Sequence, residues 1–516
     1  MIRKHGPRTW KNVHVTQQAR LEDLIDIDNS AEGALQPAGF ALLQQAARDL
    51  DRLAREARQR GVKVRALGSG WALTDIAITD GWLMNTKLLN GCFEIADRFF
   101  EAAYPADKRP YVVLAQCGIS VGELNAHLEV TAGVGFRRAL KTSGIGAGQT
   151  IAGAISGNTH GAAINFGSTP DYVVGLQLVT GRGRSLWIER ASCPVLNDDF
   201  VQQLDAERIR DDDVFNSAIV SFGAFGIITA VAIETDPIYQ LKFPPVRDIA
   251  HDELKQKLNA FKFNEPEGLY HYEFVFDPYG ANQRAMEALA TRVAYEPGHP
   301  TPTPVWIVRS DKGFALGDRA AATFLGVPLL SPGKKTAIQF QQYREKCILG
   351  NVRGTPGQLF TATITYFEGY TESALGVSIS DAAKMMDISS SIIRQMEIPA
   401  MSQVRVVHPT RALLGFTCLE PKTAVFEYGL ANNEKVADFE RRLTGALKDA
   451  GVRYTFHWSK NSGITPERLQ EMYGPDRVSR WRAARRRVFD NDPALMRVFD
   501  NDHVLRAGLQ ATSFTA

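Results

Sequence analysis

Hydrophobic residues between positions 40 and 60 recur every three or four residues, which is the spacing of one face of an α-helix. Gly61 follows the last of them, and glycine commonly ends a helix because it adopts a left-handed backbone conformation without strain. The pattern therefore predicts an amphipathic helix over Phe40–Arg60. Its inward positions are Leu43, Ala46, Ala47, Leu50, Leu53, Ala54 and Ala57.

Short runs rich in apolar and β-branched residues follow this helix and predict the strands of the first half of the chain. Two of these runs flank the turn Gly181-Arg182-Gly183-Arg184 and predict a β-hairpin. Pro237 ends the last run. The predicted strands are Val62–Ala66, Tyr111–Gln116, Asp171–Thr180, Ser185–Glu189 and a strand within Ser221–Thr235, and Val121–Thr131 is predicted as a short helix.

The pattern changes after Pro237: the predicted strands become longer and more aromatic, glycine turns become rarer, and helices alternate with strands. We therefore place a domain boundary near residue 240. The predicted strands are Tyr270–Phe276, Thr303–Arg309, Leu359–Phe367, Gln403–His408, Ala412–Cys418 and Thr423–Tyr428, and the predicted helices are Asp252–Phe261, Ala281–Val293, Ser380–Met396 and Asn433–Ala450. An antiparallel sheet with helices on one face accounts for this alternation.

The composition restricts the partners of the chain. Its 516 residues, 44% of them hydrophobic, can bury the cores of two or more domains. The net charge of +2 provides no strong field for nucleic acid or an anionic membrane. The five cysteines form no CxxC pair and signal neither a disulfide framework nor a zinc site. The N-terminus lacks the apolar core of a signal peptide, and no apolar run reaches the ~18 residues of a membrane span, so we expect a cytoplasmic protein that binds small molecules.

Glycine is concentrated in three segments. Ser143–Gly161 is the richest, Arg65–Trp71 contains the turn Gly68-Ser69-Gly70 directly after a predicted strand, and Gly223–Thr229 carries a third cluster. Glycine lets the backbone lie directly against a ligand, and the peptide N–H groups of such turns suit a diphosphate. Two such turns suggest one large nucleotide held between them. The GxGxxG spacing of a Rossmann fold, between a strand and a helix, is not met.

The order of these segments resembles the FAD-binding domain of the vanillyl-alcohol oxidase / p-cresol methylhydroxylase superfamily, over roughly residues 10–235. The matching motifs are RALGSGW at Arg65–Trp71, QTIAGAISGNTHG at Gln149–Gly161, DYVVGLQLVTGRG from Asp171 and GAFGIIT at Gly223–Thr229. In the second half, His457-Trp458-Ser459-Lys460 resembles the His-Trp-Gly-Lys motif of the aldonolactone oxidase and alditol oxidase branch, and the family-like Asp492-Pro493 and Phe499 follow. Gln403-Val404-Arg405 occupies the place of that branch's acid-x-Arg pair.

The resemblance implies an α+β fold. A two-part FAD-binding domain of the p-cresol methylhydroxylase type, residues 1–238, precedes a substrate-binding cap domain, residues 239–455, with an antiparallel sheet and helices on one face. Residues 456–516 return to the flavin site. The implied FAD contacts are Leu67, Gly68, Ser69, Gly70, Trp71, Gly148, Gln149, Thr150, Gly153 and Ala154 around the diphosphate, Gly157, Asn158, Thr159, His160 and Gly161 beside the flavin, and Ile227 and Ile228 at the adenine end.

Three positions depart from the family pattern. Trp71 stands where many members carry a histidine that is covalently bonded to the flavin, so we expect non-covalent FAD. Gln403 replaces the acid of the acid-x-Arg pair, and an amide orients a substrate but cannot act as a general base. Ser459 replaces the glycine between Trp458 and Lys460, which is a milder change.

The expected catalytic residues are Arg405, Lys460, Gln403 and His457. Arg405 and Lys460 are the candidate cations of the site, and the fork of Arg405 suits a substrate oxygen. Lys460 acts as a base only if burial beside Arg405 lowers its pKa, and His457 and His408 are the alternative bases. His160 is expected to be a structural hydrogen-bond partner.

The resemblance implies an FAD-dependent oxidase or dehydrogenase that oxidises a CH–OH group by hydride transfer to flavin N5. A sugar lactone or polyol is the default substrate, and O₂ or another acceptor reoxidises the flavin. A bulkier alcohol such as a sterol or specialised metabolite, and a flavin-binding protein without catalysis, stay open. The aromatics Trp306, Phe360, Tyr366, Phe367, Tyr370 and Phe416 line either an apolar cavity or, as we favour, the packed face of the cap sheet.

Two further patterns are assigned to structure. RVFDND occurs at Arg487–Asp492 and again at Arg497–Asp502, but it lacks the glycine and the terminal glutamate of a calcium loop. We therefore expect no metal and assign its aspartates to helix capping or the surface. The arginines at 477, 480, 482, 485, 486 and 487 predict a solvated helix face paired with nearby acids.

Overall fold

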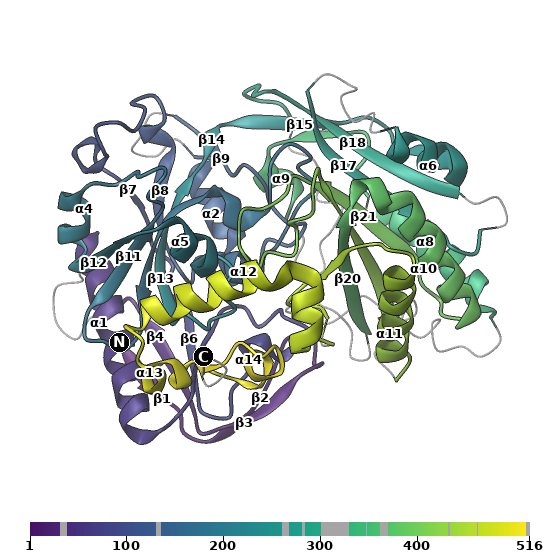
Figure 1. Ribbon diagram of the computed structural model, residues 1–516. Helices are drawn as coiled ribbons and strands as arrows, with labels where there is room; N and C mark the ends of the chain where they lie inside the picture. Colours follow the sequence, from purple (N-terminus) through teal and green to yellow (C-terminus); the bar gives the residue numbers. More distant parts are fainter. Residues whose placement is uncertain are drawn as a thin grey trace.

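The computed structural model describes residues 1–30, 39–130, 136–260, 268–280, 284–300, 330–346, 348–361, 370–431, 434–461 and 463–511. Two halves lie side by side, and a long C-terminal helix runs across the first half toward the second (Figure 1). Of the predicted strands, Thr303–Arg309 and the end of Leu359–Phe367 lie outside the described residues.

A small mixed sheet, ordered β1-β4-β6-β5, opens the first half. Its strands are β1 (Ile2–Lys4), β4 (Asp23–Asp28), β6 (Trp82–Leu88) and β5 (Val64–Leu67), and α1 (Phe40–Arg60) lies between β4 and β5 in the chain. All seven predicted inward positions of α1 are buried, and the helix ends at Gly61 with φ +67°, as predicted. A separate hairpin, β2 (Arg8–Lys11) and β3 (Gln18–Leu21), precedes this sheet.

A second sheet, ordered β12-β11-β10-β13-β8-β7, completes the first half. β10 (Val173–Val179) and β11 (Ser185–Glu189) form the predicted hairpin, and α1 contacts β10 and β13. The other strands are β12 (Ala206–Arg210), β13 (Ile227–Glu234), β8 (Val112–Gln116) and β7 (Cys92–Glu94). The helices are α2 (Val121–Leu128), α3 (Ile151–Ser156), α4 (Asp198–Gln203) and α5 (Asp212–Ala218), and β9 (Arg138–Ala139) pairs with β14 (Asp236–Pro237). Short 3₁₀ turns lie at Asp75–Ala77, Asp97–Phe99, Arg109–Tyr111, Thr169–Tyr172 and Ile379–Asp381.

The second half contains a nine-stranded antiparallel sheet, ordered β19-β15-β18-β17-β21-β22-β20-β23, with β16 also paired to β18. The strands are β15 (Tyr239–Phe243), β16 (Arg247–Ala250), β17 (Leu269–Phe276), β18 (Arg284–Ala294), β19 (Val352–Gly354), β20 (Tyr370–Ser378), β21 (Ser402–Val407), β22 (Thr423–Ala431) and β23 (Tyr454–Phe456). The helices are α6 (His251–Asn259), α8 (Pro332–Lys346), α9 (Pro356–Leu359), α10 (Ala382–Gln395) and α11 (Glu434–Asp449). The α+β architecture with an antiparallel second sheet is confirmed.

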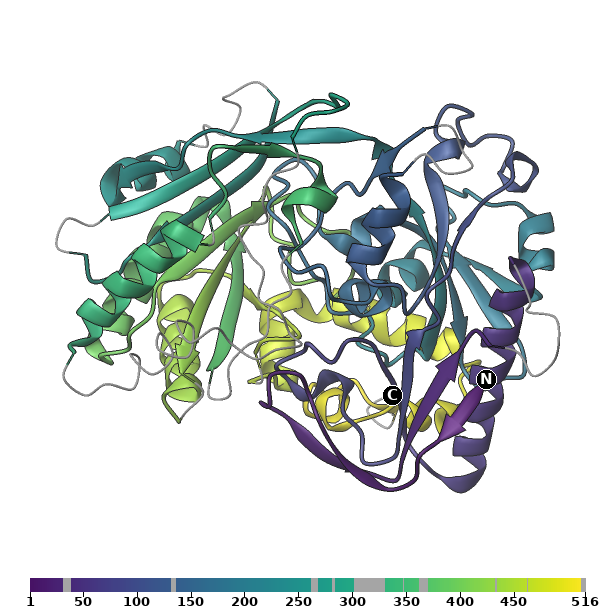
Figure 2. The same cartoon turned by 180° about the vertical axis from the view of Figure 1, so that it is seen from behind.

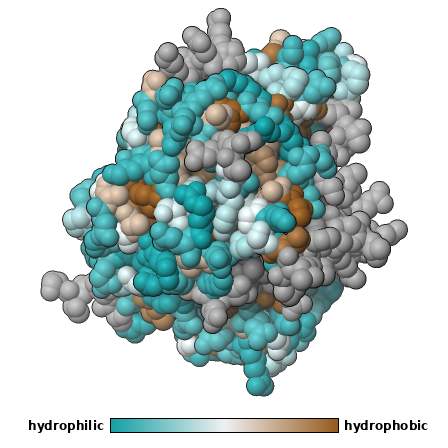
Figure 3. All heavy atoms as spheres, turned by 90° about the vertical axis from the view of Figure 1, so that its right-hand side faces the viewer, coloured by the Kyte–Doolittle hydropathy of each residue, from teal (hydrophilic) through white to brown (hydrophobic). Residues whose placement is uncertain are grey.

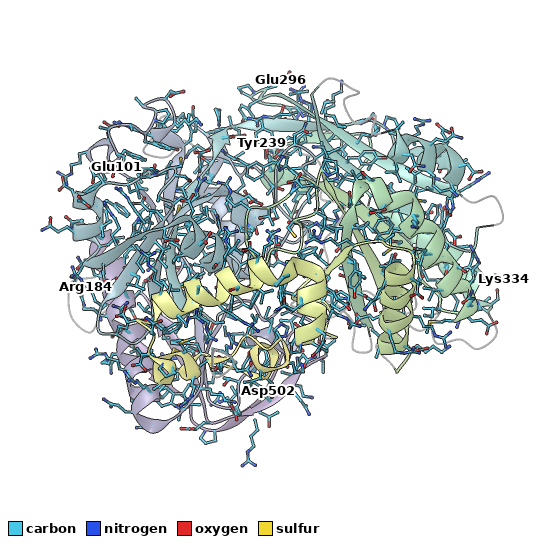
Figure 4. The ribbon with its side chains drawn as sticks, viewed as in Figure 1. Glu101, Arg184, Tyr239, Glu296, Lys334 and Asp502 are labelled. Carbon is cyan, nitrogen blue, oxygen red and sulfur yellow. The ribbon has the colours of Figure 1, made fainter. Side chains whose placement is uncertain are left out.

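The two faces of this sheet differ because strand side chains alternate. Tyr272, Phe274 and Phe276 of β17 pack in one core with residues of α6, α10 and α11. The alternate residue Glu273 lies on the opposite face, where Tyr343 of α8 donates a hydrogen bond to its Oε1 at 2.7 Å. α8, whose Lys334 is labelled in Figure 4, therefore adds a helix to the face that was expected to carry none.

Two predictions in this half are wrong. The described part of Ala281–Val293 is strand β18, although its alanines and Glu287 favour a helix. It pairs with β15, β16 and β17, so sheet pairing overrides local propensity. Ala412–Cys418 is irregular because its polar groups have other partners: Leu414 O, for example, accepts a hydrogen bond from Trp458 Nε1 at 2.7 Å. The described start of Leu359–Phe367 ends α9 and is not a strand.

The junction between the halves lies near the predicted boundary. β15 begins at Tyr239, whose hydroxyl donates to Leu140 O at 2.8 Å and lies 2.9 Å from the hydroxyl of Tyr270; Figure 4 labels Tyr239. β23 belongs to the cap sheet and crosses the predicted division after residue 455. The division into 1–238, 239–455 and 456–516 remains a prediction.

The face of the second half seen in Figure 3 is mainly hydrophilic, with scattered hydrophobic residues among the atoms that are coloured. Among the residues that the structure describes, no helix has both the length and the apolar composition needed to cross a membrane.

The C-terminal segment is fastened to the first half by a buried arginine. α12 (Pro466–Val488) contains non-helical backbone at Gly474, before Pro475, and α13 (Pro493–Val498) and α14 (Asp502–Arg506) follow. The Arg485 side chain is fully buried and donates to Asp500 Oδ1 at 2.7 Å and to the carbonyls of Ala224, Leu509 and Met496. The prediction of a solvated face is therefore wrong for Arg485, although Arg480 and Arg487 pair with acids as expected. Asp492 caps α13, as predicted.

Replacement of Arg485 by methionine is expected to lower the free energy of unfolding by about 3–5 kcal/mol, because it leaves Asp500 buried without its cation. The control is Arg487→Ala, which removes a half-exposed ion pair with Asp211 and is expected to cost less than about 1 kcal/mol. Denaturant titration of both variants measures the difference, and equal losses would show that Arg485 does not anchor the segment.

Candidate active site

A cavity of about 530 Å³ lies between the glycine-rich turns of the first half and the cap sheet. It brings together most of the predicted cofactor-binding residues, namely Leu67, Gly68, Ser69, Gly70, Trp71, Gln149, Thr150, Gly153, Gly157, Thr159, His160 and Ile228. The predicted residues Gly148, Ala154, Asn158, Gly161 and Ile227 do not line it. All four predicted catalytic residues, Arg405, Lys460, Gln403 and His457, line its other wall.

The cofactor wall is made of backbone because side chains would collide there. A Cβ atom on Gly68 would lie 2.1 Å from Thr150 Oγ1, and one on Gly148 would lie 2.6 Å from the Trp71 ring. The Ser69 hydroxyl donates to Gly148 O at 2.5 Å and joins the two turns. Backbone that approaches this closely, along one extended cavity, fits the diphosphate and rings of a bound FAD.

The tip of the N-terminal hairpin, residues 12–17, holds the turn that follows β5 in place. The sequence analysis did not predict this role of the tip. Figure 2 shows the hairpin that carries it at the lower edge of the molecule. The tip hydrogen-bonds to the backbone of four consecutive residues, 70–73. Its contacts are Val13 N to Gly70 O (3.0 Å), His14 to the backbone of Trp71, Asn12 Nδ2 to Ala72 O (2.9 Å), and Thr16 Oγ1 and Gln17 Nε2 to Leu73 O (2.9 and 3.1 Å).

His14 is buried at this tip, while the apolar residues on either side of it are exposed. Val13 and Val15 are each 41% exposed, whereas His14 is fully buried and its ring meets that of Trp71 edge-on, with centroids 6.4 Å apart. Val15 has φ +55°, which is strained for a β-branched residue. Burial, with a smaller contribution from the charge of Lys460, lowers the pKa of His14 to about 4, so the imidazole is neutral at pH 7. Strain and exposed apolar surface at one turn indicate a function, and the contacts of His14 indicate that it positions Trp71.

The opposite wall is set by strand register. Residues directly opposite each other on paired strands share a face. Arg405 lies opposite Glu273, and Gln403 lies opposite Glu427. Glu372 lies opposite Gly429, which is two residues after Glu427 on β22 and therefore on the same face. Five polar side chains from four strands therefore lie on the inner face of the cap sheet, and all but Glu273 line the cavity.

Glu427 is the centre of an ion-pair cluster on this face. It is 5% exposed, with Oε2 at 2.9 Å from Arg405 Nη2 and Oε1 bonded to Lys460 Nζ. Lys460 Nζ also lies 2.5 Å from Glu372 Oε2. Burial alone would raise the pKa of Glu427, but Arg405 and Lys460 outweigh it and lower that pKa. Burial likewise opposes the charge of Lys460, but Glu372 and Glu427 raise its pKa, so the condition for Lys460 to act as a base is not met.

The Gln403 amide is oriented by a second buried acid. Its Nε2 donates to Glu273 Oε1 at 2.8 Å, and the Tyr343 hydroxyl donates to the same oxygen. Burial would raise the pKa of Glu273, but His271 and Arg405 lower it, so Glu273 remains a carboxylate and accepts only. The amide nitrogen is thus directed at Glu273, and the amide oxygen is the group that can accept a hydrogen bond from a ligand.

The histidines of the cavity are weak bases. Burial lowers the pKa of His160 to about 4 and that of His457 well below its usual value. His457 Nδ1 accepts from Ser459 N at 3.1 Å, and both rings pack against Phe416. His408 is exposed and does not line the cavity. Because unfolded imidazoles take a proton below about pH 6.5 and these do not, the folded protein loses stability as the pH falls from 6.5 towards 4.

Two of the six aromatic residues that were expected to line a cavity or pack on the cap sheet can be placed in the structure. Phe416 packs on the two histidines, and Phe360 stacks on His271 with ring centroids 5.9 Å apart. Both are buried and neither lines the cavity, which agrees with the packed interpretation. Trp306, Tyr366, Phe367 and the side chain of Tyr370 lie outside the described residues.

The turn 457–461 after β23 carries Lys460 to the cavity and joins the two halves. Lys460 N donates to His457 O at 3.0 Å, and Asn461 Oδ1 accepts from Ala374 N of β20 at 3.0 Å. Leu73 N of the first half donates to Ser459 O at 2.8 Å. Ser459, which stands in place of the family glycine, lines the cavity beside Gly157.

Replacement of Asn12 by alanine is expected to weaken FAD binding about tenfold, because the turn 70–73 loses a partly buried hydrogen bond worth ~1.4 kcal/mol. Fluorescence titration of the apoprotein with FAD measures the dissociation constant. The matched control is Lys11→Ala, an exposed residue one position earlier, which is expected to leave that constant unchanged. Equal affinity in the two variants would exclude the tip from the cofactor site.

Comparison with known proteins agrees with this geometry. The FAD binding domain family matches residues 39–189. The L-gulono-1,4-lactone dehydrogenase of Mycobacterium tuberculosis is 25% identical over 454 residues, which cover 85% of this chain and 90% of that protein. The D-arabinono-1,4-lactone oxidase of Eremothecium gossypii is 31% identical over 189 residues, 37% of this chain and 30% of that protein. A solved cholesterol oxidase from B. sterolicum has the same fold, with a TM-score of 0.70 and 16% identity over 98% of this chain and 97% of that one.

The matched domain includes the turns Arg65–Trp71 and Ser143–Gly161 that form the cofactor wall, so the cofactor is FAD. Residues 39–189 therefore form an FAD binding domain, and the chain as a whole is similar to an L-gulono-1,4-lactone dehydrogenase.

Proposed function

We propose that this protein oxidises a CH–OH group of a sugar lactone or polyol with non-covalently bound FAD, and that O₂ or another acceptor then takes the electrons. The observation that carries the proposal is one continuous cavity with two unlike walls. A glycine-rich backbone wall faces the inner face of the cap sheet, which presents Gln403 and Arg405, and the turn after β23, which presents Lys460. Relatives that are named for sugar lactones support this substrate class.

The charged wall favours a hydroxyl-rich substrate over a sterol. An apolar substrate would leave Arg405 Nε, which has no hydrogen-bond partner within the described residues, and the Gln403 amide oxygen against apolar atoms, at a cost of several kcal/mol. The likeness to cholesterol oxidase concerns the fold alone. A sugar lactone, in contrast, offers oxygen atoms to both cations and hydroxyl groups to the Gln403 amide oxygen.

Bound FAD supplies a hydride acceptor, and the cap residues position the substrate. Within the described residues Arg405 Nε has no hydrogen-bond partner, so this guanidinium can donate to a substrate oxygen while Nη2 holds Glu427. Lys460 contributes a fixed positive charge. His457 is neutral and packed, and we assign it a supporting role beside Lys460.

Anaerobic mixing with an alcohol panel tests the function. We expect sugar 1,4-lactones or polyols to bleach the flavin absorbance, because they satisfy the polar wall, and cholesterol to leave it unchanged. Dithionite is the control for a reducible flavin. Bleaching by dithionite but by no member of the panel would favour a flavin-binding protein without catalysis, and bleaching by cholesterol alone would favour the bulky-alcohol alternative.

FAD is expected to leave the protein on acid precipitation, because the indole of Trp71 packs against Gly148 and has no nitrogen able to replace the histidine that forms the family's covalent bond. Absorbance of the supernatant and the pellet measures the partition of the flavin. A yellow pellet, or a flavin adduct in the mass of the intact chain, would contradict non-covalent binding.

A further inference from the structure

The proposed oxidation requires a base that the predicted residues do not supply. The carbon of the alcohol gives a hydride to FAD, the oxygen gives up a proton, and a carbonyl forms. Gln403 accepts no proton at neutral pH, and Lys460 already carries one. His160 and His457 line the cavity, but both rings pack against Phe416, His457 Nδ1 already accepts from Ser459 N, and His160 Nδ1 lies 3.0 Å from Gly161 O. A carboxylate of the cavity wall can accept the proton instead.

We infer that Glu372 of β20 is the general base of this reaction, an assignment that rests on the proposed function. Glu372 lines the cavity and lies on the same sheet face as Gln403 and Arg405. Its partner across the strands is Gly429, which also lines the cavity and has no side chain to cover the carboxylate. Its side chain is 16% exposed, so a substrate hydroxyl can reach it.

The two other acids on this face are already committed. Glu427 lies between Arg405 and Lys460, and those two cations hold it in its ionised form. Glu273 accepts from Gln403 and Tyr343 and does not line the cavity. Glu372 pairs with Lys460, which fixes the position of the carboxylate. Of the two acids that line the cavity, Glu372 is the more exposed, at 16% of its side chain against 5% for Glu427, and is therefore the one that a substrate hydroxyl can reach.

A carboxylate base at position 372 keeps the total charge of the cavity constant during the reaction. The hydride carries one negative charge to the cofactor side, and the proton removes one negative charge from Glu372. The total charge of the cavity is thus the same before and after the step, so the buried cluster needs no compensating ion. The charged groups that face Glu372 are Lys460 on the turn after β23, Glu427 on β22 and Arg405 on β21.

The test uses the FAD-loaded protein in anaerobic stopped flow with the lactone or polyol that reduces the wild type. Glu372→Gln is expected to slow flavin reduction about 10²–10⁴-fold, while its substrate dissociation constant changes little. Glu372→Asp, which keeps a retracted carboxylate, is expected to lose less. Glu253→Gln, an exposed glutamate of α6, is the matched control and should equal the wild type.

Chemical rescue separates a lost base from a structural role. Added formate is expected to restore flavin reduction in Glu372→Ala and to leave the wild type unchanged. The flavin spectrum and the dithionite reduction of each variant show that the cofactor is in place. Two results would overturn the assignment of Glu372 as the base and leave the proposed function standing. One is a Glu372→Gln variant that reacts at the wild-type rate, and the other is a Glu372→Ala variant that keeps FAD but is not rescued by formate. If dithionite bleaches the flavin of the wild type but no alcohol does, both the proposed function and the assignment of the base are overturned.

Discussion

Glu427 lies buried on the inner face of the cap sheet between the guanidinium of Arg405 and the ammonium of Lys460. Burial of any one of these charges alone would cost several kcal/mol, and the group is tolerated because strand register brings opposite charges into contact. Both cations consequently stay protonated, and together with Glu427 and Glu372 they give this wall of the cavity fixed charges of both signs. The positions of the neighbouring polar groups depend on this cluster.

The two walls of the cavity use different physical means. The first half presents glycine backbone, for example at Gly68, Gly153 and Gly157, and the hairpin tip at residues 12–17 holds the first turn in place. The cap presents side chains, which the register of β17, β20, β21 and β22 fixes. The turn 457–461 is bonded to both, so the position of Lys460 depends on the two halves together.

The departure at Gln403 from the family pattern is compensated within the sheet. The neighbouring strands supply three carboxylates, and one of them, Glu273, directs the Gln403 amide nitrogen away from the ligand. Position 403 thus carries an amide whose nitrogen is held by Glu273, and the carboxylates of this face stand on β17, β22 and β20.

The sequence alone determined what depends on neighbouring residues in the chain. The apolar period predicted α1 and its end at Gly61, the turn at 181–184 predicted the β10–β11 hairpin, and the ordered glycine segments located most of the cofactor wall. The tertiary structure decided what depends on distant segments. β18 is a strand because three others pair with it, and Arg485 is buried because Asp500 and three carbonyls surround it. His14 meets Trp71 because the hairpin tip folds over the first turn, and Glu372 lines the cavity because of its strand register. Periodicity and glycine content are local properties, whereas register and burial are set by contacts between segments far apart in sequence, which no local pattern encodes.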